Sequence, residues 1–240
     1  MHVVQQAGGA QQGSQEPIRR RINNFLSHWV SRLRVALLVI LAAAAVALVA
    51  YLVYVEVSHK LASDSALMAE HLQTQFDSWS AETDTARKAA LEKDLFEQLN
   101  ALISRYPRQY GGERGLFMRA DAWYQKKEWD SAAKDYQALA ARFPGSYLAP
   151  ISLFDAGVCL EEKGQVDAAL ALYLKVSTDY KDSAVAPRAM FDTGRLYEAK
   201  SDWADAQKTY QSMDDSFAQS MWTRLGKNRL VELKVLGKIK

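Results

Sequence analysis

The stretch ARFPGSYLAP, residues 141–150, interrupts a sequence whose apolar residues otherwise follow the spacing of helices. Two prolines and a glycine so close together are typical of a loop between two helices. Its residue types return at intervals of 37 residues: the aromatic at Tyr106, Phe143, Tyr180 and Phe217, and the proline at Pro150 and Pro187. A fixed interval of this length predicts an array of structural repeats.

Each interval has the pattern of two helices. In the middle one, PISLFDAGVCLEEKG is followed by QVDAALALYLKVSTDY, with apolar residues at helical spacing in both and Gly164 at the turn between them. Small residues that permit close helix approach recur at Ala120, Gly157 and Gly194 and at Ala132, Ala169 and Ala206, and bulky residues recur at Trp123, Leu160 and Tyr197 and at Tyr136, Tyr173 and Tyr210. Such a hairpin cannot bury its apolar face alone, so the hairpins are expected to stack.

At these residues the chain resembles the tetratricopeptide repeat (TPR), a helical hairpin of about 34 residues. The positions that carry the resemblance are Leu116, Ala120, Trp123, Ala132, Tyr136 and Pro144 in residues 113–146, then Leu153, Gly157, Leu160, Ala169 and Tyr173 in 150–183, then Met190, Gly194, Tyr197, Ala206 and Tyr210 in 187–220. The second and third units lack the final proline. We predict an all-α solenoid with three TPR-like repeats in residues 111–220.

The repeat pattern continues more weakly on both sides. Residues 56–110 are predicted to form a helical stalk and a degenerate first repeat, in which a helix over 56–82 meets an antiparallel partner over 84–106 after a break at residues 83–85. Residues 221–240 are predicted to form a basic capping helix, with six basic residues against Glu232. We interpret that helix as a solvated cap, and the alternative is a patch that binds anionic lipid or an acidic partner.

The N-terminal part has the layout of a membrane anchor. Residues 35–55 carry no charge, and as a helix they extend about 31 Å, enough to cross the hydrocarbon layer of a bilayer. Before them, residues 18–34 have the pattern of a basic amphipathic juxtamembrane segment, and residues 1–17 that of a disordered cytoplasmic tail. The alternative is a cleavable signal peptide, but its apolar region is usually only about 7 to 15 residues long.

The charged flanks of the apolar segment predict its orientation, because Lys and Arg stay on the cytoplasmic side. Five arginines precede it (Arg19, Arg20, Arg21, Arg32 and Arg34), whereas only Glu56, His59 and Lys60 follow it closely. We therefore predict a single-pass inner-membrane protein with a cytoplasmic N-terminus and periplasmic repeats. The same distribution argues against an adaptor that faces the cytoplasm.

The sequence offers no constellation for catalysis. The histidines His2, His28, His59 and His71 all lie outside the three clear repeats, and Cys159 sits in an apolar helical pattern that favours a buried side chain over a reactive thiol. GGERG at residues 111–115 lacks the strand and the Lys-Ser/Thr of a phosphate loop, and we interpret it as a turn before a helix. We expect no enzyme activity, no cofactor, no metal, no small-molecule substrate and no nucleic acid.

The resemblance implies that the first helices line a concave, ligand-binding groove. The implied groove residues are Arg114, Phe117, Asp121, Tyr124 and Gln125, then Ile151, Phe154, Val158, Glu161 and Glu162, then Arg188, Phe191, Arg195, Glu198 and Ala199. We expect Phe117, Phe154 and Phe191 to hold an apolar or partly unfolded client segment, with polar contacts from Tyr124, Arg188 and Arg195. The alternative is that the three phenylalanines pack between hairpins. Phenylalanine also stands where the family's carboxylate clamp has lysine, which disfavours recognition of peptide C-termini.

The layout of the whole chain resembles the ancillary Sec translocon subunits of bacterial inner membranes, a family that contacts periplasmic chaperones. That resemblance implies chaperone-like binding of exported clients next to the translocon. The repeats are also similar to those of TPR proteins of outer-membrane assembly and of cell-division coordination. They imply the alternative, a scaffold that joins envelope complexes through folded partners.

Overall fold

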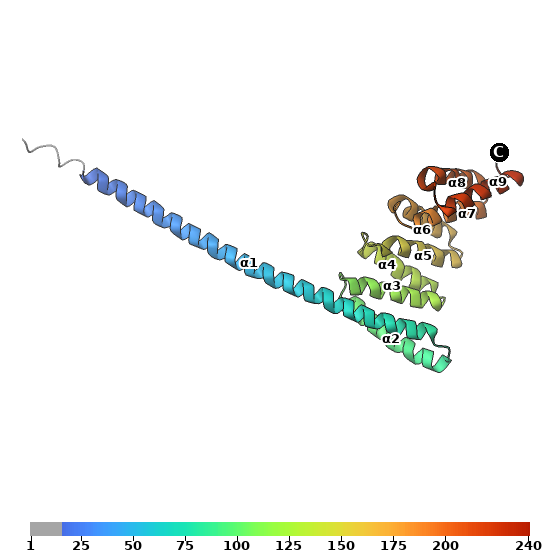
Figure 1. The fold of residues 1–240 in the computed structure, drawn as a ribbon, viewed down its shortest axis with the longest axis horizontal. Helices are drawn as coiled ribbons and strands as arrows, with labels where there is room; N and C mark the ends of the chain where they lie inside the picture. Colours follow the sequence, from blue (N-terminus) through green and yellow to red (C-terminus); the bar gives the residue numbers. More distant parts are fainter. Residues whose placement is uncertain (1–15) are drawn as a thin grey trace, which may run out of the picture. The chain divides into compact units, whose positions relative to one another are not determined.

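The computed structural model describes residues 16–240, which form nine helices and no strand (Figure 1). The predicted all-α class is therefore confirmed for this part of the chain. The helices are α1 Glu16–Ala81, α2 Thr85–Arg105, α3 Tyr110–Gln125, α4 Trp129–Arg142, α5 Leu148–Glu162, α6 Val166–Asp179, α7 Ala186–Ala199, α8 Trp203–Phe217 and α9 Met221–Val235. The chain divides between His59 and Lys60 into two compact units. The predicted tail, residues 1–17, lies outside the described residues apart from its last two.

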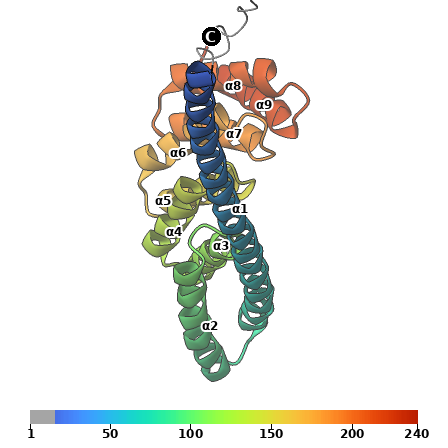
Figure 2. The ribbon, with the colours of Figure 1, turned by 90° about the vertical axis from the view of Figure 1, so that its left-hand side faces the viewer.

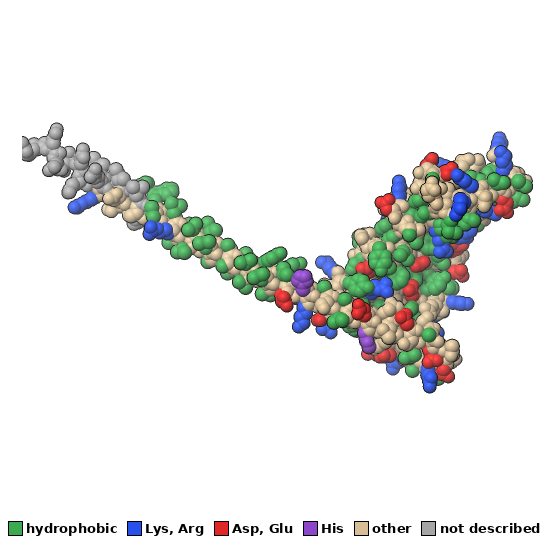
Figure 3. All heavy atoms as spheres, viewed as in Figure 1, with side chains coloured by type: hydrophobic (Ala, Val, Ile, Leu, Met, Phe, Trp, Pro, Cys, Tyr) green, Lys and Arg blue, Asp and Glu red, His purple; other side chains and the backbone are tan. Residues whose placement is uncertain are grey.

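The first unit is the N-terminal part of α1, which runs without a break through the predicted junction between residues 34 and 35. A window of α1 within Arg32–Ala81 has a mean hydropathy of 2.9, and none of it is buried. Figure 3 shows hydrophobic side chains along this stretch and basic ones nearer its N-terminal end. Among the described residues, α1 is the one helix that is long and apolar enough to cross a membrane.

The second unit begins with a hairpin made by the end of α1 and by α2, which lie side by side in Figure 2. Leu72 and Trp79 of α1 pack with Leu99 and Leu102 of α2 in one buried cluster, which also contains residues of α3. The two helices are separated by residues 82–84, one residue earlier than the break expected at 83–85. Asp84 caps α2 by accepting a hydrogen bond from the Arg87 N–H at 2.8 Å. This hairpin therefore shares its core with the repeats that follow.

Three further hairpins follow, α3–α4, α5–α6 and α7–α8, and the 37-residue interval sets their geometry. Their second helices begin at Trp129, Val166 and Trp203, which are 37 residues apart. At the same point of each inner turn stands a residue with a left-handed backbone: Lys127 (φ 60°), Gly164 (φ 73°) and Ser201 (φ 59°). Only the middle repeat has glycine, the residue that adopts this conformation without strain. The turn geometry is thus kept even where its preferred residue is missing.

Close approach within the hairpins depends on the small residues found in the sequence. A Cβ atom on Gly157 would lie 2.5 Å from Cε1 of Tyr173, and one on Gly194 would lie 2.4 Å from Cε1 of Tyr210. Both tyrosines are almost fully buried. The glycine of the first helix therefore makes room for the tyrosine ring of the second helix.

The interpretation of GGERG as a turn is wrong, because residues 111–115 lie inside α3. Their glycines permit close contact with the preceding hairpin. A Cβ on Gly111 would lie 2.4 Å from the backbone oxygen of Ser65, and one on Gly112 would lie 2.0 Å from that of Tyr106. The segment is a helix start packed tightly against neighbouring backbone.

The last helix, α9, covers the end of the array by packing against α8 and α7. Ser220 caps it by accepting a hydrogen bond from the Trp222 N–H at 3.2 Å, and Leu233 is fully buried in a cluster with Tyr210 and Met213. Its opposite side leaves Val231 and Val235 exposed among basic residues.

Candidate protein-binding groove

The residues predicted to line a groove all lie on the first helices of the three hairpins, α3, α5 and α7. We call the surface that they form the A-helix face. Its phenylalanines pack against the tyrosine of the same hairpin: Phe117 on Tyr136 (ring centroids 5.9 Å apart), Phe154 on Tyr173 (5.1 Å) and Phe191 on Tyr210 (5.7 Å). Phe154 is only 3 % exposed, whereas Phe117 and Phe191 are half-buried. The structure thus places Phe154 in the core, so the row of three phenylalanines that was expected to hold a client segment is interrupted there.

Arginine side chains lie over two of these rings. The guanidinium carbon of Arg188 is 4.6 Å from the Phe154 ring centroid, and that of Arg114 is 5.8 Å from the Phe117 ring centroid. Arg188 also lies 5.5 Å from the ring centroid of Trp222 on α9. These cation–π contacts add to packing. The guanidinium edges make polar contacts as well, from Arg114 to Oε1 of Gln73 at 2.7 Å and from Nε of Arg188 to Oδ2 of Asp192 at 3.7 Å.

A tyrosine, a glutamate and an arginine meet on the A-helix face of the second repeat. Tyr173 donates a hydrogen bond to Oε2 of Glu161 at 3.2 Å, and the guanidinium of Arg195 donates to both oxygens of Glu161, at 2.6 and 2.8 Å. Arg195 belongs to the next hairpin, so the contact joins α5 to α7. It is a bidentate, charge-assisted pair, which favours one geometry, and it lowers the pKa of Glu161.

The same arrangement recurs one repeat later. Tyr210 donates to Oε1 of Glu198 at 2.6 Å, and Arg229 of α9 donates to the same oxygen at 3.1 Å and to the other one as well. Burial opposes ionisation of Glu198, but these hydrogen bonds outweigh it and leave its pKa lowered. We call the two groups, Tyr173–Glu161–Arg195 and Tyr210–Glu198–Arg229, the carboxylate ladder. Three of the predicted groove residues, Glu161, Arg195 and Glu198, thus hold neighbouring helices together.

The first repeat differs from this pattern. Tyr136 donates its hydrogen bond to Asp121, and Tyr124 stands where the later repeats have glutamate. Tyr124 is 37 % exposed and packs edge-on against Trp129, with ring centroids 5.1 Å apart. Val158 stands where the third repeat has Arg195. The A-helix face between α3 and α5 therefore carries carboxylates without the arginine that neutralises them elsewhere.

The electrostatics of this region follow from that difference. Burial, together with the charge of Asp121, raises the pKa of Asp155 to about 7, although Arg188 acts in the opposite direction. Burial also raises the pKa of Asp121, against the opposing effect of its hydrogen bond from Tyr136. The ionised forms of both carboxyls are thus disfavoured in the folded protein, in contrast to Glu161.

Asp155→Asn is expected to stabilise the fold at pH 8, by about 2 kcal/mol, because each pKa unit corresponds to about 1.4 kcal/mol and water still screens part of this carboxyl. A carboxyl whose folded pKa lies above its unfolded value destabilises the fold as the pH rises through that interval. The gain should therefore shrink as the pH falls from 7 to 4. Urea unfolding of wild type and variant across this range measures it.

The matched control for this prediction is Asp179→Asn, since Asp179 is an exposed carboxyl on α6 whose pKa is lowered by its hydrogen bond from Lys175. It should give no stabilisation at pH 8. A stability difference for Asp155→Asn that stays the same from pH 8 to pH 4 would show that Asp155 carries no raised pKa.

Two kinds of reactive site can be examined in the described residues, the single thiol and groups of metal-binding side chains. Cys159 is fully buried, and burial together with the charge of Asp155 raises the pKa of its thiol to about 12, so the reactive thiolate is suppressed. Within residues 16–240 no group of three or more His, Cys, Asp or Glu side chains is placed to hold a metal ion.

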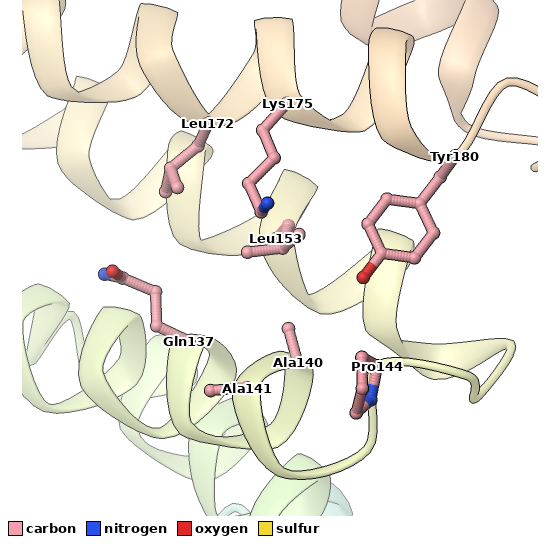
Figure 4. Close-up of a pocket in the computed structure, with 8 residues that line it drawn as sticks. All are labelled: Gln137, Ala140, Ala141, Pro144, Leu153, Leu172, Lys175 and Tyr180. Atoms are coloured by element: carbon pink, nitrogen blue, oxygen red, sulfur yellow. The ribbon is translucent and has the colours of Figure 1, made fainter.

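Three clefts lie on the side of the second helices and were missed by the sequence reasoning. The cleft between α4 and α6, of about 370 Å³, is the most apolar; Figure 4 shows Leu172 and Lys175 pointing from α6 toward Ala140 of α4. The others lie between α6 and α8 (about 330 Å³) and between α2 and α4 (about 210 Å³). The predicted groove residues line none of these three clefts. Ala140, which lines the α4–α6 cleft, occupies the repeat position that the larger Ile103 holds one repeat earlier. Aligning the repeats would have shown this smaller side chain.

Comparison with known families agrees with this architecture. The model of the tetratricopeptide repeat matches residues 114–146, 152–183 and 188–220. These ranges fall on α3–α4, α5–α6 and α7–α8 and within the predicted repeats. No curated protein matches the chain. The hairpins of residues 114–220 are therefore tetratricopeptide repeats, a module for protein–protein interaction.

Proposed function

We propose that the chain is a membrane-anchored, non-catalytic binding module whose repeats face the periplasm and hold exported polypeptides beside the Sec translocon. The observation that carries the proposal is the A-helix face. It presents exposed aromatic and charged side chains, among them Tyr124, Glu162 and Arg188. Beneath them, the buried rings of Tyr136, Tyr173 and Tyr210 fill the cores of the three hairpins. Such a face offers apolar contact and polar contacts to an extended segment without the fold having to open.

The membrane part of the proposal is supported by the exposed apolar stretch of α1. Residues 35–55 have no packing partner in the described structure, and a soluble protein rarely leaves an apolar surface of this size in contact with water. A bilayer would cover it. The exposed Arg20, Arg21, Arg32 and Arg34 before this stretch support a cytoplasmic N-terminus, and hence repeats on the opposite side.

Site-specific crosslinking in intact membranes tests the binding role. A photo-crosslinking phenylalanine analogue at Tyr124 probes the A-helix face, and the same analogue at Lys134, an exposed residue of α4, is the matched control. We expect position 124 to capture many exported polypeptides in unfolded form and components of the translocon, and position 134 to capture few.

The other outcomes of this experiment are also informative. One folded partner captured in fixed stoichiometry from position 124 would favour the alternative, a scaffold between envelope complexes. Equal capture from both positions would contradict a binding role of the A-helix face. Orientation has its own control, since protease added to sealed spheroplasts should digest the repeats; full protection of residues 60–240 would place them in the cytoplasm.

A further inference from the structure

The last helix, α9, takes the place that the first helix of a fourth hairpin would occupy. Arg229 of α9 donates to both carboxylate oxygens of Glu198 on α7. In the same way, Arg195 of α7 donates to both oxygens of Glu161 on α5. The contact that joins one first helix to the next is therefore repeated between α7 and α9.

α9 also ends in the turn that connects each first helix to its second helix. In the three inner turns, a residue with a left-handed backbone donates its N–H to the carbonyl three residues earlier, and the next N–H donates five residues back. Gly237 (φ 66°) and Lys238 repeat this pattern after α9. The second helices α2, α4 and α6 end differently, with a hydrogen bond from an aromatic residue to the carbonyl four residues earlier. The end of α9 is thus that of a first helix.

One side of α9 is exposed and mainly apolar. We call it the α9 face, and it consists of Met221, Leu225, Asn228, Val231 and Val235. Its four apolar side chains are between 38 % and 81 % exposed. The residues after α9 leave it uncovered, since Lys238 lies over the ring of Trp203 on α8 instead. A helix that caps a repeat array normally has a polar outer side, so this apolar face calls for another explanation.

The corresponding residues of α7 are those that pack on their own second helix. When α7 and α9 are aligned at their glutamate-binding arginines, Leu225 falls at the position of Phe191. Asn228 falls at the position of Gly194. Phe191 packs on Tyr210 of α8 with ring centroids 5.7 Å apart, and Gly194 makes room for the same ring. In the part of the chain that the structure describes, no second helix makes these contacts with α9.

The charges on and beside the α9 face are basic and only partly paired. Lys227 and Arg229 form ion pairs with carboxylates of the fold. Arg224, on the face, and Lys234, beside it, form no ion pair with another described residue. A second copy of α9 would bring these cations against each other, whereas a helix with carboxylates would neutralise them.

We propose that the α9 face binds an acidic amphipathic helix of a partner protein, which takes the place of the second helix of a fourth hairpin. The occupant is a helix because α4, α6 and α8 fill the same place in the three complete hairpins. Asn228 stands where glycine admits a tyrosine ring, so the partner presents a small side chain there. This surface shares no residue with the A-helix face and does not depend on the binding of exported polypeptides.

Two peptides test the proposal on the full-length chain in nanodiscs of zwitterionic phosphatidylcholine. Both are helical, with leucine and alanine along one face, and the other positions hold glutamate in the first peptide and lysine in the second. Fluorescence anisotropy should show that the lysine peptide binds about tenfold more weakly or less, because only the glutamate peptide meets the unpaired cations with opposite charge.

A substitution on the α9 face locates the binding. Val231→Glu adds a carboxylate to the apolar surface, so it should weaken binding of the glutamate peptide about tenfold. The melting temperature should not change, because the Val231 side chain is exposed. Tyr147→Glu is the matched control, since it adds the same charge at an exposed side chain in the loop between α4 and α5, and it should leave the affinity unchanged. Equal affinities of Val231→Glu and wild type would overturn the site.

A solvatochromic dye on the Lys227→Cys variant distinguishes the other occupants, because Cys159 is buried and is not labelled. A blue shift on addition of the glutamate peptide supports the proposal. A shift that needs only phosphatidylglycerol in the nanodisc would assign the face to a membrane surface, and one that follows protein concentration would assign it to a second copy. Either result, or no shift under any of these conditions, would overturn the proposal and leave the crosslinking expected at Tyr124 unaffected.

Discussion

Replacing Gly112 with alanine is expected to lower the free energy of unfolding by about 3 kcal/mol or more. The added Cβ would lie 2.0 Å from the carbonyl oxygen of Tyr106 and 2.9 Å from its carbon. Both are backbone atoms of the turn between α2 and α3, so no rotation of a side chain relieves the contact. Urea unfolding of the full-length chain, followed by circular dichroism, measures the loss.

Gly145→Ala is the control for this prediction, because a Cβ at Gly145 meets nothing within 4 Å. Alanine there should change the stability little, or raise it slightly by restricting the unfolded chain. Similar losses for the two variants would show that α3 does not start against the Tyr106 backbone, and that GGERG is the turn which its composition indicates.

Trp79→Ala is expected to destabilise the fold by about 4 kcal/mol. Trp79 is 1 % exposed at the end of α1, packs against Phe76 with ring centroids 5.6 Å apart, and has the Lys88 ammonium 5.1 Å from its ring centroid. Its cluster also holds residues of α2 and α3, so the cavity weakens the contact between the first hairpin and the repeats. The melting temperature and protection of residues 60–110 from proteolysis should both fall.

The control is Tyr147→Ala, since the Tyr147 side chain is 68 % exposed and its removal leaves no cavity. It should stay within about 0.5 kcal/mol of wild type. If the melting temperature of Trp79→Ala equals that of this control, the first hairpin is an independent stalk. The core that it shares with α3 then does not contribute to the stability of the repeats.

The sequence predicted the hairpins because their signal is local and repeated. Proline, glycine and aromatic residues at a 37-residue interval mark the loops, and Asp84 marks the start of α2 by a capping preference that needs no tertiary information. Gly157 and Gly194 were identified as points of close approach because bulky tyrosines recur at a fixed distance after them. For the loops and the glycines, the same residue type at the same position of another repeat supported the prediction.

The sequence was misleading in two situations. In one, the contact that explains a residue comes from a distant part of the sequence, and in the other, the burial of a residue does not follow from its position in the repeat. GGERG has the composition of a turn, and only its contact with the Ser65 backbone, 46 residues earlier, explains why glycine stands in a helix. Repeat position placed Phe154 on the correct helix, but its burial depends on the Tyr173 ring and on the guanidinium of Arg188. Periodicity assigns a residue to a face and leaves its depth undetermined.

The carboxylate ladder was present in the sequence but was not identified. Glu161 and Arg195 were both named as groove residues, yet their spacing of 34 residues becomes meaningful only when position twelve of one repeat is known to meet position nine of the next. Pairing these positions across repeats would have predicted the ion pair between Glu161 and Arg195. It would also have singled out Val158 as the exception.

Contacts in residues 60–240 run almost entirely between helices that are adjacent in the chain or separated by one helix. Each hairpin can therefore acquire its native neighbours as soon as it has been synthesised, without waiting for the C-terminal residues. Because a chain is synthesised from its N-terminus, the α1–α2 hairpin can form before the repeats and provide the surface against which α3 packs. Assembly then advances in one direction, and α9 closes it.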